Sequence, residues 1–282
     1  MPCTRSHAVR VTTAEKAGQG PSQDRIFRTD NAVIVLDGAS EPGHRRRDGG
    51  WMAQTLGEQV QRNLHDDPRA DLRRALRDAI ATVATRHALT PRAAPSSTVS
   101  VIRWTPDDVE VLVLGDSPVT VQTADGATET VRDDRLATVA CEQRRACLAV
   151  VASRGIAELD TATWQALVDA QRAQRNQPGG YWIGEAEPEA ADHAIVRRWP
   201  RDEVTAAVAV TDGVADAVDS YGVVETWTDL AQQAIYQPAS LLELVDQAEA
   251  SDPDGRRWHR LKRHDDKAIA AVTLVLNGAS AT

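Results

Sequence analysis

Two hydrophobic patterns alternate along the chain. One consists of short apolar runs, and the other of longer segments with an apolar residue at every fourth position. Five runs rich in Val, Ile and Leu predict buried strands, at residues 31–37, 97–104, 108–116, 204–212 and 267–276. The run at 108–116 leads directly into residues 118–126, where apolar and polar side chains alternate before an Asp-Gly turn. We therefore expect residues 97–126 to form a meander of antiparallel strands joined by hairpin-sized turns.

A spacing of four marks the helical segments. Residues 52–64 and 72–84 each repeat an apolar side chain at every fourth position, which predicts two successive amphipathic helices. Three more helices are predicted, after a cap at Asp160, over residues 225–236, and after a capping box of Ser240 and Glu243. The order does not alternate as βαβ units do, so it predicts an α+β fold in which helices cover two antiparallel sheets from outside.

Length, composition and charge narrow the class of protein. With 42% hydrophobic and 26% charged residues in a chain of 282, a sizeable core is possible and disorder is not expected. No run approaches the ~18 apolar residues of a membrane span, so no transmembrane helix is expected, and the first ten residues lack the continuous apolar stretch of a secretory signal. The charge of −9 argues against a nucleic-acid partner. We expect one cytoplasmic domain over residues 7–277, with flexible tails at 1–6 and 278–282.

Aspartates gather at the predicted ends of strands. Asp37 and Asp212 each end a strand and precede a glycine, whereas Asp116 ends a strand and follows one. The acidic pair at 265–266 lies just before the last strand, and Asp24 before an early one. A single Asp-Gly pair is typical of a turn, but carboxylates that converge repel one another unless a cation neutralises them. Oxygen ligands favour Mg²⁺ or Mn²⁺ over zinc.

Six motifs carry these aspartates and the strands around them. They are SQDR at 22–25, VIVLDGAS at 33–40, STVSVIRW at 97–104, VLVLGDSPVTV at 111–121, VAVTDGVAD at 208–216 and HDDKAIAAV at 264–272. In this order the set resembles the metal-dependent type 2C protein phosphatases, the PPM class. Residues 175–188, RNQPGGYWIGEAEP, are similar to a segment of compact actinobacterial members. The resemblance covers residues 7–277 and depends on order and spacing, because each motif alone is weak.

The resemblance implies a four-layer αββα sandwich, two antiparallel β-sheets flanked by helix pairs, with a two-metal centre at one end. Asp37 matches the aspartate that bridges the two Mg²⁺ or Mn²⁺ ions, and Gly38 matches the residue that offers its carbonyl oxygen. Asp212 and Asp265 match the later aspartates of the first metal. Asp24 matches an aspartate near the second metal.

Other positions are implied to assist this centre. Asp116 matches an aspartate that helps to hold a third metal in bacterial members, while Asp216 and Asp266 are expected to support the metal ligands. Gln23 stands where the early motif of the family has glutamate. Its amide oxygen can still ligate or accept a hydrogen bond but carries no charge, so the affinity for the second metal is expected to be lower.

The implied activity is hydrolysis of phosphoserine and phosphothreonine in proteins. Asp37, Asp212 and Asp265 would be the catalytic residues, holding two cations that share a bridging hydroxide, and this hydroxide attacks phosphorus without a protein nucleophile. The partner would be a phosphorylated protein, supplied by a Ser/Thr kinase system, with no nucleic acid and no membrane.

Phosphate binding departs from the family pattern. Many members place an arginine four residues before the early acid, and this chain has Gln19 there. Arg25, Arg45 and Arg46 could bind phosphate instead, since a forked guanidinium suits this anion. The alternative is that residues 41–50 form a solvated loop.

Two other functions remain open, and a third is excluded. Gln19 and Gln23 are consistent with a pseudophosphatase that binds a partner through the same fold, and a small phosphorylated metabolite could be the substrate instead of a protein. The Gly-Asp-Ser-Pro run superficially matches an esterase motif, but Ser117 lies mid-chain in a hairpin, where that motif does not occur. His44 could be an acid for the leaving group or a bystander.

Overall fold

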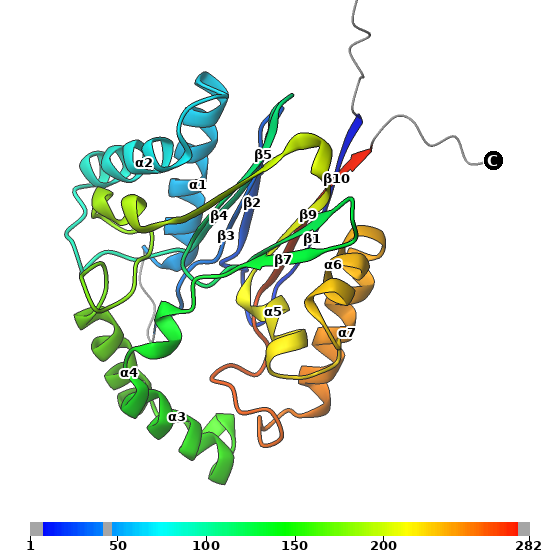
Figure 1. The fold of residues 1–282 in the computed structure, drawn as a ribbon. Helices are drawn as coiled ribbons and strands as arrows, with labels where there is room; N and C mark the ends of the chain where they lie inside the picture. The colour runs from blue at the N-terminus through cyan, green and yellow to red at the C-terminus, as the bar shows by residue number, and fades with distance from the viewer. Residues whose placement is uncertain (1–7, 42–46, 276–282) are drawn as a thin grey trace, which may run out of the picture.

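Two antiparallel sheets lie face to face in the computed structural model, which describes residues 8–41 and 47–275 (Figure 1). The first sheet has the order β1-β10-β9-β6-β7: Ala8–Lys16, Lys267–Val275, Val204–Val210, Val119–Thr123 and Thr128–Val131. The second has the order β2-β3-β4-β5-β8: Arg25–Arg28, Ala32–Leu36, Val99–Trp104, Asp108–Leu114 and Ile195–Pro200.

The apolar runs become strands that are buried on both faces. In β3, Val33 and Val35 pack between the sheets, whereas Ile34 and Leu36 face the helices. Every residue of this strand is buried, because successive side chains of a strand point to opposite sides and both sides are covered. A strand in such a position needs an unbroken apolar run, which is the pattern seen in the sequence.

Helices form the two outer layers. α1 (Gly49–Asp66) and α2 (Leu72–His87) pack on the second sheet. α6 (Trp227–Tyr236) and α7 (Pro238–Ser251) pack on the first, together with the short α5 (Asp212–Asp219). The molecule is therefore an α+β, four-layer αββα sandwich (Figure 1), as the sequence predicts.

A further helix pair lies outside the four layers, near one end of the sandwich (Figure 1). It consists of α3 (Cys141–Arg154) and α4 (Thr161–Ala173), and Asp160 caps α4 by accepting the Thr163 N–H. Four short 3₁₀ helices complete the described elements, at Arg135–Thr138, Ile156–Glu158, Pro188–His193 and Arg201–Glu203. The pair covers the end of the sandwich at which the candidate site lies.

Two local predictions are wrong. The expected meander breaks after β5, since β6 pairs with β7 and β9 in the other sheet. Gly115 makes this crossing possible, because its φ of 87° is open to glycine at little cost. Ser240 does not cap α7, which begins at Pro238, because a proline at the first position needs no N–H partner there.

No helix within the described parts of the chain has both the length and the apolar character that a membrane crossing requires.

Candidate metal centre

The aspartates predicted at strand ends come together at one end of the sandwich. Asp37 follows β3 of the second sheet, while Asp212 follows β9 and Asp265 precedes β10 of the first sheet. All three line a cleft of about 440 Å³, and Asp116, just after β5, lines it too. Residues more than 200 positions apart in the chain thus share one cavity because the ends of both sheets open into it.

Asp37 is held by the neighbouring strand. Its backbone N–H donates to Thr98 Oγ1 at 3.0 Å, and its carbonyl oxygen accepts the Thr98 N–H at 2.9 Å. The chain then passes directly over the start of α1: a Cβ on Gly38 would lie 2.3 Å from the carbonyl carbon of Gly49. Only glycine at position 38 permits this approach. The contact with Gly49 therefore fixes the course of the backbone after Asp37.

A second close approach fixes Asp265 relative to Asp212. A Cβ on Gly213 would lie 2.1 Å from the backbone oxygen of Asp266. The Asp266 carboxylate in turn accepts the N–H groups of Gly18 and Gln23, each at 2.8 Å. Asp266 therefore ties the early loop to the segment before β10.

Burial and mutual repulsion raise the pKa values of several carboxylates in the cleft. Burial raises the pKa of Asp37 well above its usual range, and the charges of Asp212 and Asp24 raise it further. Burial also raises the pKa of Asp212, with Asp265 adding to the effect. For Asp116, burial and the Asp212 charge raise the pKa to about 7. Such shifts show that the ionised cluster needs positive charge.

Asp24 provides a direct test of whether a cation fits. Its side chain is 2% exposed, and Oδ2 accepts the Thr211 hydroxyl at 2.8 Å. Oδ1 is buried and has no hydrogen-bond partner among residues 8–41 and 47–275. A buried carboxylate oxygen without a partner is costly unless a cation binds it. The donor set is oxygen only, which fits Mg²⁺ or Mn²⁺.

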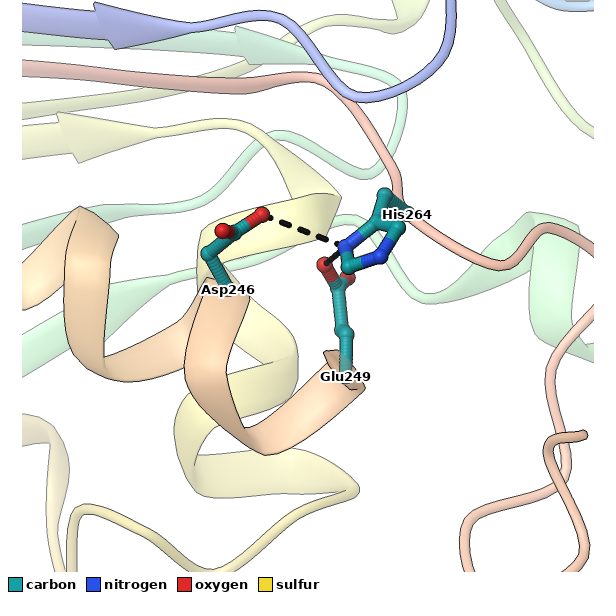
Figure 2. Close-up of side chains that lie close together, drawn as sticks. All are labelled: Asp246, Glu249 and His264. Carbon is teal, nitrogen blue, oxygen red and sulfur yellow. Dashed lines mark hydrogen bonds and ion pairs between the residues drawn. The ribbon is translucent and has the colours of Figure 1, made fainter. Parts of the chain in front are cut away.

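Behind Asp265 lies a cluster of charged side chains, shown in Figure 2. His264 Nδ1 is 3.1 Å from both Asp246 Oδ1 and Glu249 Oε2. This is the one group of three His, Cys, Asp or Glu side chains within the described residues whose ligand atoms all lie within 4.8 Å of one another. Lysines 16 and 267 already pair with its carboxylates, so the cluster has its positive charge and serves to brace the segment before β10.

The other predicted positions divide between the cleft and the scaffold. Asp216 lines the cleft, and burial raises its pKa to about 7. Gln23 and Gln19 line an adjoining cavity of about 480 Å³, and the Gln23 amide oxygen accepts the Ser40 hydroxyl at 2.6 Å. Trp182, in the segment 175–188, is buried in the core and stacks on His193.

Arg25, one of the three predicted phosphate-binding arginines, does not line the cleft. The Arg25 guanidinium donates to Gln54 and to the backbone oxygens of Ser22 and Asp24, so it holds the early loop together. Arg45 and Arg46 lie outside the described residues, as does His44.

Four cationic residues that the sequence analysis missed line the cleft, namely Arg132, Arg144, Arg260 and Lys262. Lys262 lies 2.5 Å from Asp265 Oδ1. Arg144, on α3, has a buried Nε with no hydrogen-bond partner in residues 8–41 and 47–275. A lone basic residue in a loop or on an exposed helix has no pattern that could have revealed it.

Solved structures of serine/threonine phosphatases share this fold. The catalytic domain of the serine/threonine phosphatase PstP, in complex with two manganese ions, has a TM-score of 0.58 at 16% identity, covering 96% of this chain and 100% of that one. The serine/threonine phosphatase of S. agalactiae has a TM-score of 0.58 at 15% identity, covering 95% and 100%. MsPP of Mycobacterium smegmatis, a PPM Ser-Thr phosphatase in complex with cacodylate, has a TM-score of 0.55 at 16% identity, covering 94% and 98%.

The family follows from the sequence match. The model of the protein phosphatase 2C family matches residues 12–246, and the chain therefore belongs to that family of metal-dependent phosphatases. No protein with a curated description matches the chain.

Proposed function

We propose that this protein removes phosphate from phosphoserine and phosphothreonine in protein substrates, with Mg²⁺ or Mn²⁺ as its cofactor. One observation carries the proposal. Asp37, Asp212 and Asp265, from both sheets, line one cleft. Burial raises the pKa of Asp24, and the charges of Asp212, Asp266 and Asp265 raise it further. Such a set of carboxylates is suited to binding hard cations and has no other evident use.

The side chains divide into ligands and supports. Asp37, Asp212 and Asp265 would hold the first cation, and Asp37 and Asp24 the second, with the Gly38 carbonyl oxygen as a further ligand. Asp116 would assist a third ion. When bound, the cations lower the pKa of water toward neutrality and offset the charge of the phosphoryl oxygens. Asp266 keeps the early loop and the segment before β10 in register with each other.

The far wall of the cleft supports a protein as the substrate. α3 and α4 line it with apolar side chains, Leu148, Trp164, Leu167 and Val168. These side chains can contact residues that flank a phosphorylated serine or threonine, whereas a small polar metabolite has nothing to bury there. Arg144 on the same wall is a candidate phosphate ligand, because its Nε lacks a partner among the described residues. A Ser/Thr kinase would have to supply such a substrate.

The experiment compares substrates and variants in the same assay. We expect Mn²⁺-dependent release of phosphate from phosphoserine and phosphothreonine peptides, with EDTA abolishing it, and a higher kcat/KM for peptides than for sugar or nucleotide phosphates. Asp37→Asn and Asp212→Asn should each lose activity by about 100-fold or more. The exposed Asp30→Asn is the matched control. A fully active Asp37→Asn variant would contradict the proposed centre, and preference for a metabolite would contradict the substrate class.

A further inference from the structure

The lysines of the chain have an unusual distribution. There are only three, Lys16, Lys262 and Lys267, whereas the chain has 29 arginines. All three lie around the segment that carries Asp265: Lys16 pairs in register with Lys267 across β1 and β10, and Lys262 precedes Asp265 by three positions. Lys16 and Lys267 have partners in the braced cluster behind the cleft. Lys262 is the lysine that lines the cleft itself.

Lys262 makes its ion pair with an expected metal ligand. Its Nζ lies 2.5 Å from Asp265 Oδ1, and the same oxygen accepts the backbone N–H of Asp266 at 2.9 Å. The Lys262 side chain is 28% exposed, so the pair is only partly screened by water. Lys262 thus occupies Oδ1 of Asp265, one of the two carboxylate oxygens that can bind a divalent cation.

The charges around Lys262 extend beyond this pair. Burial alone would lower the pKa of Lys262, but the carboxylates of Asp265, Asp212 and Asp37 outweigh it and raise the pKa above its ordinary value. The ammonium thus contacts Asp265, and it is attracted by all three carboxylates that would hold the first cation. An ammonium and a divalent cation a few ångströms apart repel each other strongly in a partly buried site.

The loop that carries Lys262 is firmly built. The Asp252 carboxylate accepts the N–H groups of Arg256, Arg257 and Trp258, and it pairs with the Arg260 guanidinium at 3.0 Å. The backbone therefore presents Lys262 to the cleft, while its four-carbon stem leaves the ammonium free to move. Lysine fits this use better than arginine, because a compact charge can leave a carboxylate without breaking a bidentate pair.

We propose that Lys262 is a built-in competitor of the divalent cation for Asp265. Its ammonium neutralises the carboxylates of the cleft, and a cation that binds Asp265 displaces it. Lys262 thereby stabilises the metal-free fold and weakens the affinity for metal, so the enzyme responds to higher metal concentrations than the carboxylates alone would require. This inference rests on the metal site of the proposed function.

Removing the charge of Lys262 tests its effect on the affinity for metal and its effect on the stability of the metal-free fold. Lys262→Met keeps the length of the stem and removes the ammonium. We expect its Kd for Mn²⁺, measured by titration calorimetry, to fall by roughly five- to tenfold, since a partly exposed charge pair is disrupted. The melting temperature in EDTA should also fall, because the carboxylates of the cleft lose the Lys262 ammonium that neutralises them. Lys262→Arg should keep a Kd near that of the wild type, and Arg86→Met, which removes an exposed positive charge on α2, should leave it unchanged.

The outcomes are distinguishable. A Kd that is equal or higher in Lys262→Met would overturn the inference while leaving the metal site intact. A raised KM for a phosphopeptide with an unchanged Kd for Mn²⁺ would also overturn it, and would assign Lys262 to substrate binding. If neither the wild type nor Lys262→Met binds Mn²⁺, both the inference and the proposed function fail.

Discussion

The Lys267 ammonium lies 2.6 Å from Glu249 Oε2, and both side chains are completely buried. The same ammonium donates to the backbone oxygen of Asp265 at 2.7 Å. Glu249 belongs to α7 and Lys267 begins β10, so this pair joins an outer helix to the strand next to the cleft. It therefore bears on both the stability of the fold and the position of Asp265.

Glu249→Gln should destabilise the protein by about 3 kcal/mol, because it leaves the Lys267 charge buried without its counter-ion. Urea denaturation measures this loss. Glu243→Gln is the matched control, since Glu243 pairs with Lys16 at the surface, and it should cost less than about 1 kcal/mol. The double variant Glu249→Gln with Lys267→Met should recover part of the loss. Equal effects of the two single variants would show that the buried pair has no special role.

Thr211 joins two buried groups, the carboxylate of Asp24 and the backbone N–H of Ala268. Its hydroxyl donates to Asp24 Oδ2 at 2.8 Å and accepts the Ala268 N–H at 2.9 Å. Thr211→Val has nearly the same shape but can do neither, so we expect a loss of about 1–3 kcal/mol in the free energy of unfolding. Thr211→Ser should restore most of it. If Ser and Val variants unfold at the same urea concentration, the hydroxyl is not the cause.

The centre could be predicted from the sequence where an aspartate directly follows an apolar run, as Asp37 and Asp212 do. A strand end has a defined place in the fold, so its neighbours in space can be anticipated. The bond between Thr211 and Asp24 could not be anticipated in this way, because it joins residues 187 positions apart through side chains alone. Lys262 was missed for a related reason, since its position depends on how Asp252 shapes the preceding loop.

Two features of the fold could not be predicted from the sequence, each for a local reason. α3 buries only Cys147 and Val151, so its sequence lacks the apolar stripe that marks α1 and α2. The crossing of β6 to the other sheet depends on the backbone conformation of Gly115, and a glycine between two strands is equally compatible with a hairpin.

Asp37→Asn should have opposite effects on activity and on stability. Burial and the neighbouring charges of Asp212 and Asp24 raise the pKa of Asp37, so its ionised form is unfavourable in the metal-free fold. The amide of asparagine is about the same size as the carboxylate of aspartate, but it carries no negative charge. We therefore expect the melting temperature in EDTA at pH 8 to rise above that of the wild type, although activity is lost. Asp30→Asn, at an exposed position, should change neither. A lower melting temperature for Asp37→Asn would mean that its carboxylate is already well compensated.

The metal-free protein should lose stability as the pH rises toward neutrality. Burial, with a contribution from the Asp212 charge, raises the pKa of both Asp116 and Asp216 from 3.8 to about 7. A carboxyl group with a raised pKa in the fold binds its proton more tightly there than in the unfolded chain. Its stabilising effect is complete below the unfolded pKa and is lost as the pH rises through the folded one.

Melting temperatures in EDTA at pH 5, 6, 7 and 8 test whether stability falls as the pH rises. We expect the midpoint to fall across this range, and to fall less in the double variant Asp116→Asn with Asp216→Asn, since these groups no longer titrate. Asp66→Asn, on the exposed face of α1, should keep the wild-type slope. Saturating Mn²⁺ should raise the midpoint most at pH 8, because a cation binds the deprotonated carboxylates and stabilises the state that holds it. A wild-type slope in the double variant would place the titration in other groups.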